Sequence, residues 1–313
     1  MVRSPWRLRR DLSPKARDGK RLFLLTLPFI IGVFIFAYLP LFGWAYAFVD
    51  YKPGQALSKL KFVGLKWFNI PFSNPVFRMQ LLRVLKNTLG INLLYMAAML
   101  LPLLFAMFLM EVRSVRFRKA VQTLTTIPNF ISWVLVYAVF YALLSTDGLV
   151  NSIRTQLDSS LSPVNYLTQA KHPWLKMLMY HEWKSLGWSA IMYISAITSI
   201  DQEIYEAAEI DGAGRFSKMF YVTLPHLMPT FFVLLVMQIG NMLNSGMDQY
   251  MVFSNPITKD GIEVLDLYLY NNGLKQGQIS YSTAIGMSKT IIGIILLSIG
   301  NGFSKLVRGE SIF

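Results

Sequence analysis

The sequence contains no cysteine, so the chain has neither a disulfide framework nor a thiolate metal site. Histidine is also scarce. The three histidines, His172, His181 and His226, have no metal-ligand spacing. We interpret His181 and the adjacent Glu182 as residues of a loop rather than of a site. The chain is therefore predicted to bind no metal or cofactor of its own.

Charged residues are few, at 15% of the chain against 54% hydrophobic residues, which is far more apolar than a soluble domain. They are concentrated in connectors between long uncharged runs, a pattern typical of polytopic membrane proteins. The net charge of +13 does not indicate nucleic-acid binding, because the basic residues lie beside these runs, as the positive-inside rule describes. The first run is too long for the apolar region of a signal peptide, and no small-residue cleavage site follows it.

We therefore expect an all-α membrane protein with one transmembrane domain over residues 22–304. The six predicted spans are about 22–49, 87–110, 120–145, 183–200, 226–247 and 281–304. A basic arm (1–21), an arginine-rich connector (111–122) and a short tail (305–313) are all predicted to be cytoplasmic. The segments 50–86, 146–182 and 248–280 then lie outside, and residues 201–225 form a second cytoplasmic loop. We find no internal repeat.

The polar segment 203–225 is predicted to form two short helices. One face of the first carries Ile204, Ala207 and Ala208. Gly212 and Gly214 interrupt the run and permit a positive φ, so the chain can turn sharply. Pro225 suits the first turn of the next helix. Such a helix pair is either a docking surface for another protein or an ordinary loop between spans.

The order Glu206-Ala207-Ala208, then Gly212, then Leu224-Pro225 resembles the EAA loop of the membrane subunits of type I ATP-binding-cassette (ABC) importers. The flanking residues are similar to the carbohydrate branch of these permeases. Three further segments, 38–43, 63–68 and 87–89, resemble its polysaccharide-type subgroup. The resemblance implies a six-span permease whose loop inserts into a groove of an ATPase subunit. The residues assigned this coupling role are Ile204, Glu206, Ala207, Ala208, Asp211, Gly212, Leu224 and Pro225.

The chain lacks the G-x-x-x-x-G-K-[ST] phosphate loop, so it is not its own ATPase by that mechanism. The resemblance implies two separate ATP-binding subunits that hold ATP and Mg, a second permease subunit, and an extracytoplasmic solute-binding protein that delivers a saccharide. We expect the second permease subunit to be a different chain. We therefore expect an inner-membrane permease for oligo- or polysaccharide that is not itself an enzyme. An ion-coupled carrier would need carboxylates within spans. A membrane-bound glycosyltransferase would need acidic metal ligands or a nucleotide site.

Polar side chains inside spans are the candidates for lining a transport pathway. Gln238, Asn241 and Ser245 fall on one helical face of the fifth predicted span, and Asn244 falls off that face. In the fourth span, Ser189 and Tyr193 lie one turn apart, and Trp188 could offer an aromatic plane to a sugar ring. Amide and hydroxyl groups also join helices to one another in membrane bundles. The sequence leaves both roles open.

Lys289 is the one Lys or Arg well inside a predicted span. Its side chain either faces the pathway or extends to the outer interface. A pathway position would favour an anionic cargo such as a uronate oligomer, and the basic loop 50–86 favours the same cargo.

Overall fold

The computed structural model describes residues 14–56, 58 and 60–308. The fold is helical apart from one pair of two-residue strands, β1 (Val49–Asp50) and β2 (Lys61–Phe62), which are antiparallel with Val49 opposite Phe62. All-α architecture is therefore confirmed. The predicted arm 1–21 and tail 305–313 lie partly outside the described residues. In the described part of the tail, α15 continues to Arg308.

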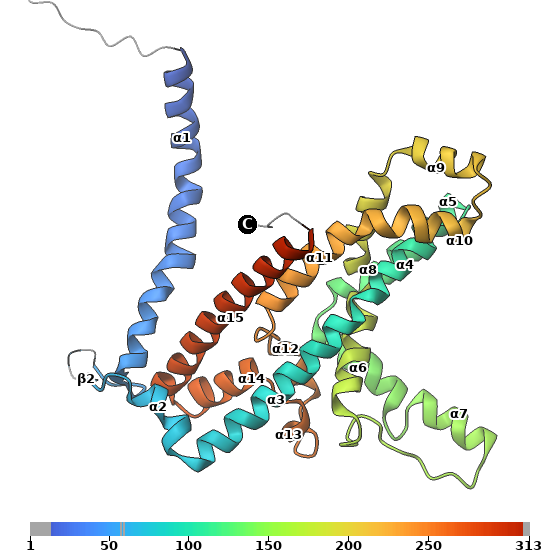
Figure 1. Cartoon of the computed structure of the whole chain (residues 1–313). Helices are drawn as coiled ribbons and strands as arrows, with labels where there is room; N and C mark the ends of the chain where they lie inside the picture. The colour runs from blue at the N-terminus through green and yellow to red at the C-terminus, as the bar shows by residue number, and fades with distance from the viewer. Residues whose placement is uncertain (1–13, 57, 59, 309–313) are drawn as a thin grey trace, which may run out of the picture.

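The first predicted span is a helical rod in three parts: α1 (Pro14–Val33), the π-helical turn η1 (Phe34–Tyr38) and the 3-10 helix η2 (Leu39–Phe48). Pro28 lies inside α1, and Pro40 lies in the first turn of η2. Figure 1 shows α1 standing away from the other helices, whereas η2 packs against α15. Apolar side chains of α1 such as Phe29 are exposed.

The second span begins well before the predicted residue 87. A short helix α2 (Lys66–Ser73) is followed by α3 (Pro75–Ala98) and α4 (Leu100–Met110). The side chain of Asn74 caps α3 by accepting a hydrogen bond from the Val76 N–H at 2.9 Å, and Pro75 follows in the first turn. The early part of α3 contains basic residues, so a prediction based on apolar runs did not include it in the span.

The third predicted span, 120–145, is wrong as a continuous helix. The structure has α5 (Val115–Thr126), the 3-10 turn η4 (Ile127–Phe130), α6 (Trp133–Leu144) and α7 (Leu149–Leu157). The break falls after Pro128, and Ser132 caps the new helix α6. The ammonium of Lys184, from α8 (Pro173–Thr198), donates to three carbonyls at the break, those of Pro128, Asn129 and Ile131, at 2.7–3.1 Å.

Helix α8 starts ten residues before its predicted position and carries polar residues that had been assigned to an outside loop. It packs against α3, α4, α5 and α11 (Leu224–Gly240). By length and apolarity, five helical segments of the described chain could span a membrane: Gly19–Phe48, Pro75–Met110, Trp133–Leu157, Arg215–Gly240 and Ile279–Gly302. Despite its 26 residues α8 is not among them. Its Lys184 is buried against the break between α5 and α6.

The segment after α8 contains α9 (Gln202–Ile210), α10 (Arg215–Lys218) and the π-helical turn η5 (Met219–Thr223). The second short helix predicted here is not separate, because α10, η5 and α11 form one continuous helix over residues 215–240. We call it the 215–240 helix. The predicted fifth span, 226–247, is therefore displaced. Residues 241–247 form turns.

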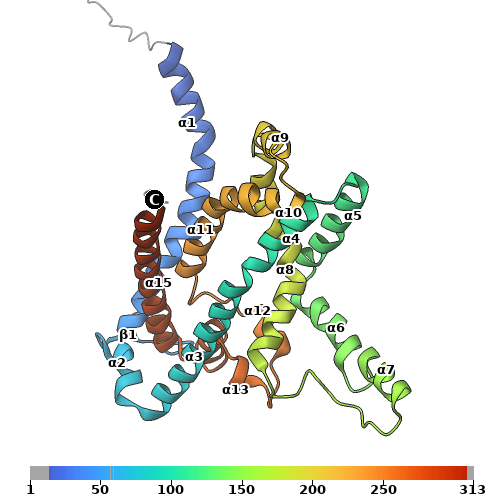
Figure 2. The ribbon, with the colours of Figure 1, turned by 45° about the vertical axis from the view of Figure 1, so that its right-hand side comes forward.

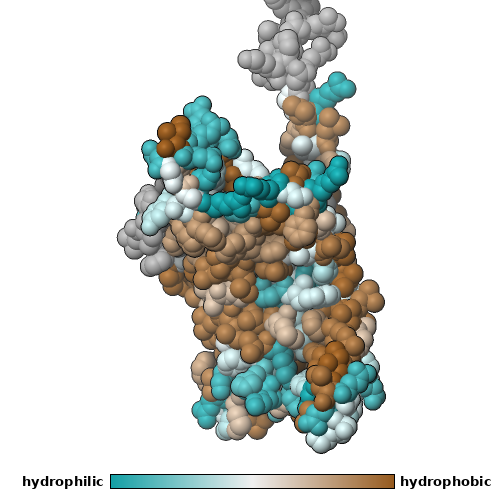
Figure 3. Space-filling model, turned by 90° about the vertical axis from the view of Figure 1, so that its right-hand side faces the viewer, coloured by the Kyte–Doolittle hydropathy of each residue, from teal (hydrophilic) through white to brown (hydrophobic). Residues whose placement is uncertain are grey.

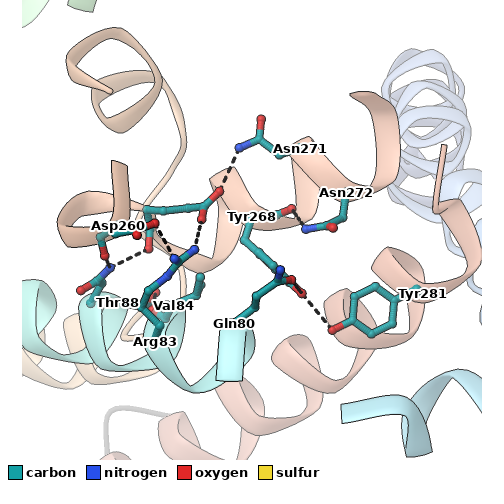
Figure 4. Close-up of polar contacts among 11 residues, drawn as sticks. Gln80, Arg83, Val84, Thr88, Asp260, Tyr268, Asn271, Asn272 and Tyr281 are labelled. Atoms are coloured by element: carbon teal, nitrogen blue, oxygen red, sulfur yellow. Dashed lines mark hydrogen bonds and ion pairs between the residues drawn. The ribbon is translucent and has the colours of Figure 1, made fainter. Parts of the chain in front are cut away.

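Four short helical segments precede the last span: α12 (Asp248–Phe253), α13 (Lys259–Ile262), α14 (Leu265–Tyr270) and the π-helical turn η6 (Asn271–Lys275). The last helix is α15 (Ile279–Arg308). Arg83 of α3 joins this region by ion pairs to Asp260 and, at 2.9 Å, to Glu263 (Figure 4). Beside it, the hydroxyls of Tyr268 and Tyr281 lie 3.2 Å apart.

The start of α1, the end of α15 and the α9–α10 turn point towards one end of the molecule, while α2, α7 and α13 lie towards the other (Figures 1 and 2). Between these ends, hydrophobic side chains cover most of the face shown in Figure 3, and hydrophilic residues gather at both ends. This distribution fits a bilayer around the middle of the helices.

Candidate functional site

A cavity of about 450 Å³ lies between α3, α4, α8 and the end of α11. Its wall includes all the pathway residues predicted on the fourth and fifth spans: Trp188, Ser189, Tyr193, Gln238, Asn241 and Ser245. The structure thus brings together residues that are far apart in the sequence. Their contact with cargo stays a prediction.

The helical argument for Gln238, Asn241 and Ser245 is wrong, although the three residues do line one cavity. Helix α11 ends at Gly240, so Asn241 and Ser245 belong to the turns of 241–247 and share no helical face with Gln238. Asn244, which the helical argument excluded, lines the same cavity.

Hydrogen bonds connect this wall to α3. The side-chain amide of Asn92 donates to the Ser245 hydroxyl at 2.7 Å, and Gln238 Nε2 donates to Asn92 Oδ1 at 3.5 Å. Asn92 was missed by the sequence argument, although an amide in an apolar span was a usable signal. The two open roles are compatible here, because these side chains join segments and also border the cavity.

The interpretation of His181 and Glu182 as loop residues is wrong. Both lie within α8 and line the cavity. The ring of His181 stacks on Tyr95 of α3, with ring centroids 4.2 Å apart and planes 24° apart. Among the described residues Glu182 forms no ion pair within 4.0 Å. A carboxylate therefore borders a cavity that no Lys or Arg of the described chain lines.

Two aromatic residues of α8 occupy different environments in this wall. Trp188 is about half exposed, at 49%, and packs edge-on against Phe130 with centroids 5.6 Å apart. Its indole can offer a plane to a cargo ring. Tyr193 is only 1% exposed, and its hydroxyl has no hydrogen-bond partner in the described structure.

Lys289 of α15 neither extends to the outer interface nor stands as an unpaired cation. Its ammonium forms an ion pair with Asp266 of α14, and the two side chains are 12% and 20% exposed. Lys289 lines a second cavity of about 380 Å³, whose wall shares Met237, Asn241 and Asn244 with the first. Because its charge is balanced within the chain, Lys289 no longer supports an anionic cargo.

The candidate coupling loop presents α9 to solvent. Ile204 is 40% exposed, and Glu206, Ala207, Asp211 and Gly212 are also exposed, whereas Ala208 is half-buried. Gly212 has φ of +80°, as predicted, whereas Gly214 has φ of −71°. Leu224 and Pro225 lie in the first turn of α11.

Two contacts hold α9 against the 215–240 helix. The hydroxyls of Tyr205 and Thr223 lie 2.8 Å apart, and Lys218 pairs with Glu209 at 3.6 Å. The loop is thus attached directly to the helix that reaches the cavity.

Residues 98–309 match the family described as the inner membrane component of binding-protein-dependent transport systems. The chain belongs to this family. The permease is 38% identical to the polygalacturonan/rhamnogalacturonan transport system permease protein YteP of Bacillus subtilis (strain 168), over 97% of this chain and 94% of that protein. It is 36% identical to protein LplB of the same organism, over 95% of this chain and 92% of that protein.

A solved structure gives the same result. The permease superposes on a chain of a bacterial alginate ABC transporter, crystallised in complex with an alginate pentasaccharide-bound periplasmic protein, with a TM-score of 0.82 and 31% identity. The match covers 95% of this chain and 99% of that one. The predicted resemblance to carbohydrate ABC importer permeases is confirmed. The carrier and glycosyltransferase alternatives are wrong.

Proposed function

We propose that this permease is one of two membrane subunits of an ATP-driven importer for an acidic oligo- or polysaccharide, such as a uronate oligomer. The observation that carries the cargo class is the near full-length similarity to permeases named for polygalacturonan/rhamnogalacturonan and alginate. Galacturonan and alginate both carry a carboxylate on their sugar rings. The solute is delivered by an extracytoplasmic binding protein.

The chemistry of the cavity supports a saccharide. Amide and hydroxyl groups donate and accept hydrogen bonds, which suits sugar hydroxyls, and Trp188 adds an aromatic plane. The described part of the cavity wall includes no Lys or Arg. The counter-charge for cargo carboxylates is therefore assigned to the second permease subunit, which we expect to be a different chain facing the same pathway.

The energy source is assigned to two separate ATP-binding subunits, which hold ATP and Mg. The exposed face of α9 is the docking surface for one of them, with the residues from Ile204 to Pro225 named above in the contact. Because both described termini point towards the α9 end, this proposal places both chain ends in the cytoplasm.

The test is ATP hydrolysis by the four-subunit transporter in lipid vesicles, with its binding protein and a panel of saccharides. Oligogalacturonate, alginate oligomers and a neutral arabino-oligosaccharide form the panel. Stimulation by a uronate oligomer and not by the neutral sugar supports the proposal. Stimulation by the neutral sugar alone contradicts the acidic cargo, and ATP hydrolysis by this chain alone contradicts the subunit assignment.

A further inference from the structure

One carboxylate holds the turn that follows α11. The backbone N–H groups of Ser245 and Gly246 both donate to Oδ2 of Asp266, at 2.9 and 3.0 Å. Gly246 has φ of +69°, so this turn uses a backbone conformation that few other residues adopt. The other oxygen of Asp266 pairs with Lys289. We call Lys289, Asp266 and these two N–H groups the Asp266 bridge.

The Asp266 bridge extends to the wall of the cavity. Ser245, whose N–H it holds, accepts a hydrogen bond from Asn92, and Asn92 accepts one from Gln238. Asn241 and Asn244 of the same turn border both cavities. A displacement of the turn therefore alters several groups that face the transport pathway.

The ion pair matters because both side chains are largely buried, at 12% and 20% exposure. A carboxylate in such a place is costly without a cation beside it, and removal of one partner leaves the other charge uncompensated. Lys289 thus balances the charge of Asp266 and orients its carboxylate, while Asp266 holds the turn.

From these contacts we propose that Lys289 is a positioning residue of the pathway rather than a cargo-binding cation. It acts through Asp266 to fix residues 241–247, and so sets the affinity of the permease for saccharides regardless of their charge. The inference rests on the proposed transport function only where cargo uptake is measured.

The variants are Lys289→Gln, Asp266→Asn and the double variant. In the double variant an amide–amide hydrogen bond can replace the ion pair, and the introduced asparagine still offers an oxygen to the two backbone N–H groups. Lys275→Gln is the matched control, because Lys275 lies over the ring of Tyr270 at 5.3 Å and outside the Asp266 bridge.

The first measurement needs no cargo. A single cysteine at position 244, in a chain without native thiols, reports the position of the turn through its rate of reaction with a water-soluble maleimide in the assembled transporter. Each single variant should raise this rate by about tenfold, because a turn that has lost one of its anchoring contacts opens to solvent more often. The double variant and Lys275→Gln should react at the wild-type rate. Equal rates in all five proteins would overturn the proposal, whatever the cargo proves to be.

The second measurement is uptake of a uronate oligomer and of a neutral arabino-oligosaccharide, each over a range of concentrations. Lys289→Gln should raise the half-saturating concentration of every transported saccharide by roughly tenfold. The double variant should recover it, and the maximal rate should change little. A loss confined to the uronate, with no recovery in the double variant and a gain in Asp266→Asn, would identify Lys289 as a cargo-binding cation instead.

Discussion

The hydroxyl of Tyr205 on α9 lies 2.8 Å from the hydroxyl of Thr223 on the 215–240 helix. Thr223 is buried and Tyr205 is partly buried, so this hydrogen bond is shielded from solvent. It joins the exposed helix α9, the proposed docking surface, to the helix whose far end borders the cavity.

Removal of this bond should weaken coupling without displacing the spans. Tyr205→Phe keeps the ring and deletes the hydroxyl, at a cost of about 1 kcal/mol in the stability of the α9 contact. We expect saccharide-stimulated ATP hydrolysis to fall while binding-protein docking is retained. Tyr221→Phe is the control, because Tyr221 is 83% exposed. Equal losses in both variants would show that the Tyr205–Thr223 bond has no special role.

Larger side chains on the exposed face of α9 should abolish coupled uptake. Ala207→Trp adds a large ring to the proposed docking surface, and Gly212→Val forces a β-branched residue into a φ of +80°. Both variants should insert into the membrane normally and lose coupled uptake. Co-purification of the ATP-binding subunits measures the docking step directly. Full uptake by Ala207→Trp would refute the assignment of α9.

Residues around the cavity should be accessible to water in at least one transport state. Cysteines placed singly at 238, 241, 244 and 245 should react with a membrane-impermeant thiol reagent. Val236 is 2% exposed and packs beside Gly300, so a cysteine there should stay protected. Protection of the four cavity positions in every state, or equal labelling at Val236, would contradict a pathway through this cavity.

Glu182 should oppose an anionic cargo. Its carboxylate lines the cavity and has no ion-pair partner in the described chain, so it repels a uronate that passes nearby. Glu182→Gln should lower the half-saturating concentration of a uronate oligomer by roughly threefold to tenfold and leave that of a neutral saccharide unchanged. Ser185→Ala is the control for a general disturbance of this wall, because Ser185 lies three residues after Glu182 in α8 and lines the same cavity. A similar shift for both cargoes would mean that Glu182 acts through structure alone.

The contact between α8 and α5 should depend on the absence of a side chain at Gly187. A Cβ there would lie 2.4 Å from the backbone of Thr125, which cannot move as a flexible side chain can. Gly187→Ala should lower the free energy of unfolding by about 1–3 kcal/mol, because the added methyl group overpacks this contact. Gly32→Ala is the matched control, because a Cβ at Gly32 meets nothing within 4 Å. Thermal unfolding in detergent compares the two variants.

The sequence argument worked where a residue's surroundings follow from local pattern. Apolar runs located the first, second and last long apolar helices, although not all of their bounds, and the turn at Gly212 was predicted from the freedom of glycine. The argument failed where other helices replace lipid as the environment. Helix α8 accommodates Glu182 and Lys184 because α3, α4, α5 and α11 pack against it, and local hydropathy cannot report that packing. The pairing of Lys289 with Asp266 was equally hidden, because it depends on how α14 packs against α15.

Because the 215–240 helix is continuous, a tilt at one of its ends displaces the other end. Thr223, where α9 is attached, and Gln238, at the cavity, are separated by 15 residues, or about 22 Å at 1.5 Å per residue. A tilt of about 5° around Thr223 would move Gln238 sideways by about 2 Å over that length. Such a movement exceeds what the 3.5 Å hydrogen bond between Gln238 and Asn92 can accommodate, so a small rotation at the α9 end, where we propose that an ATPase subunit docks, would break this contact between α11 and α3.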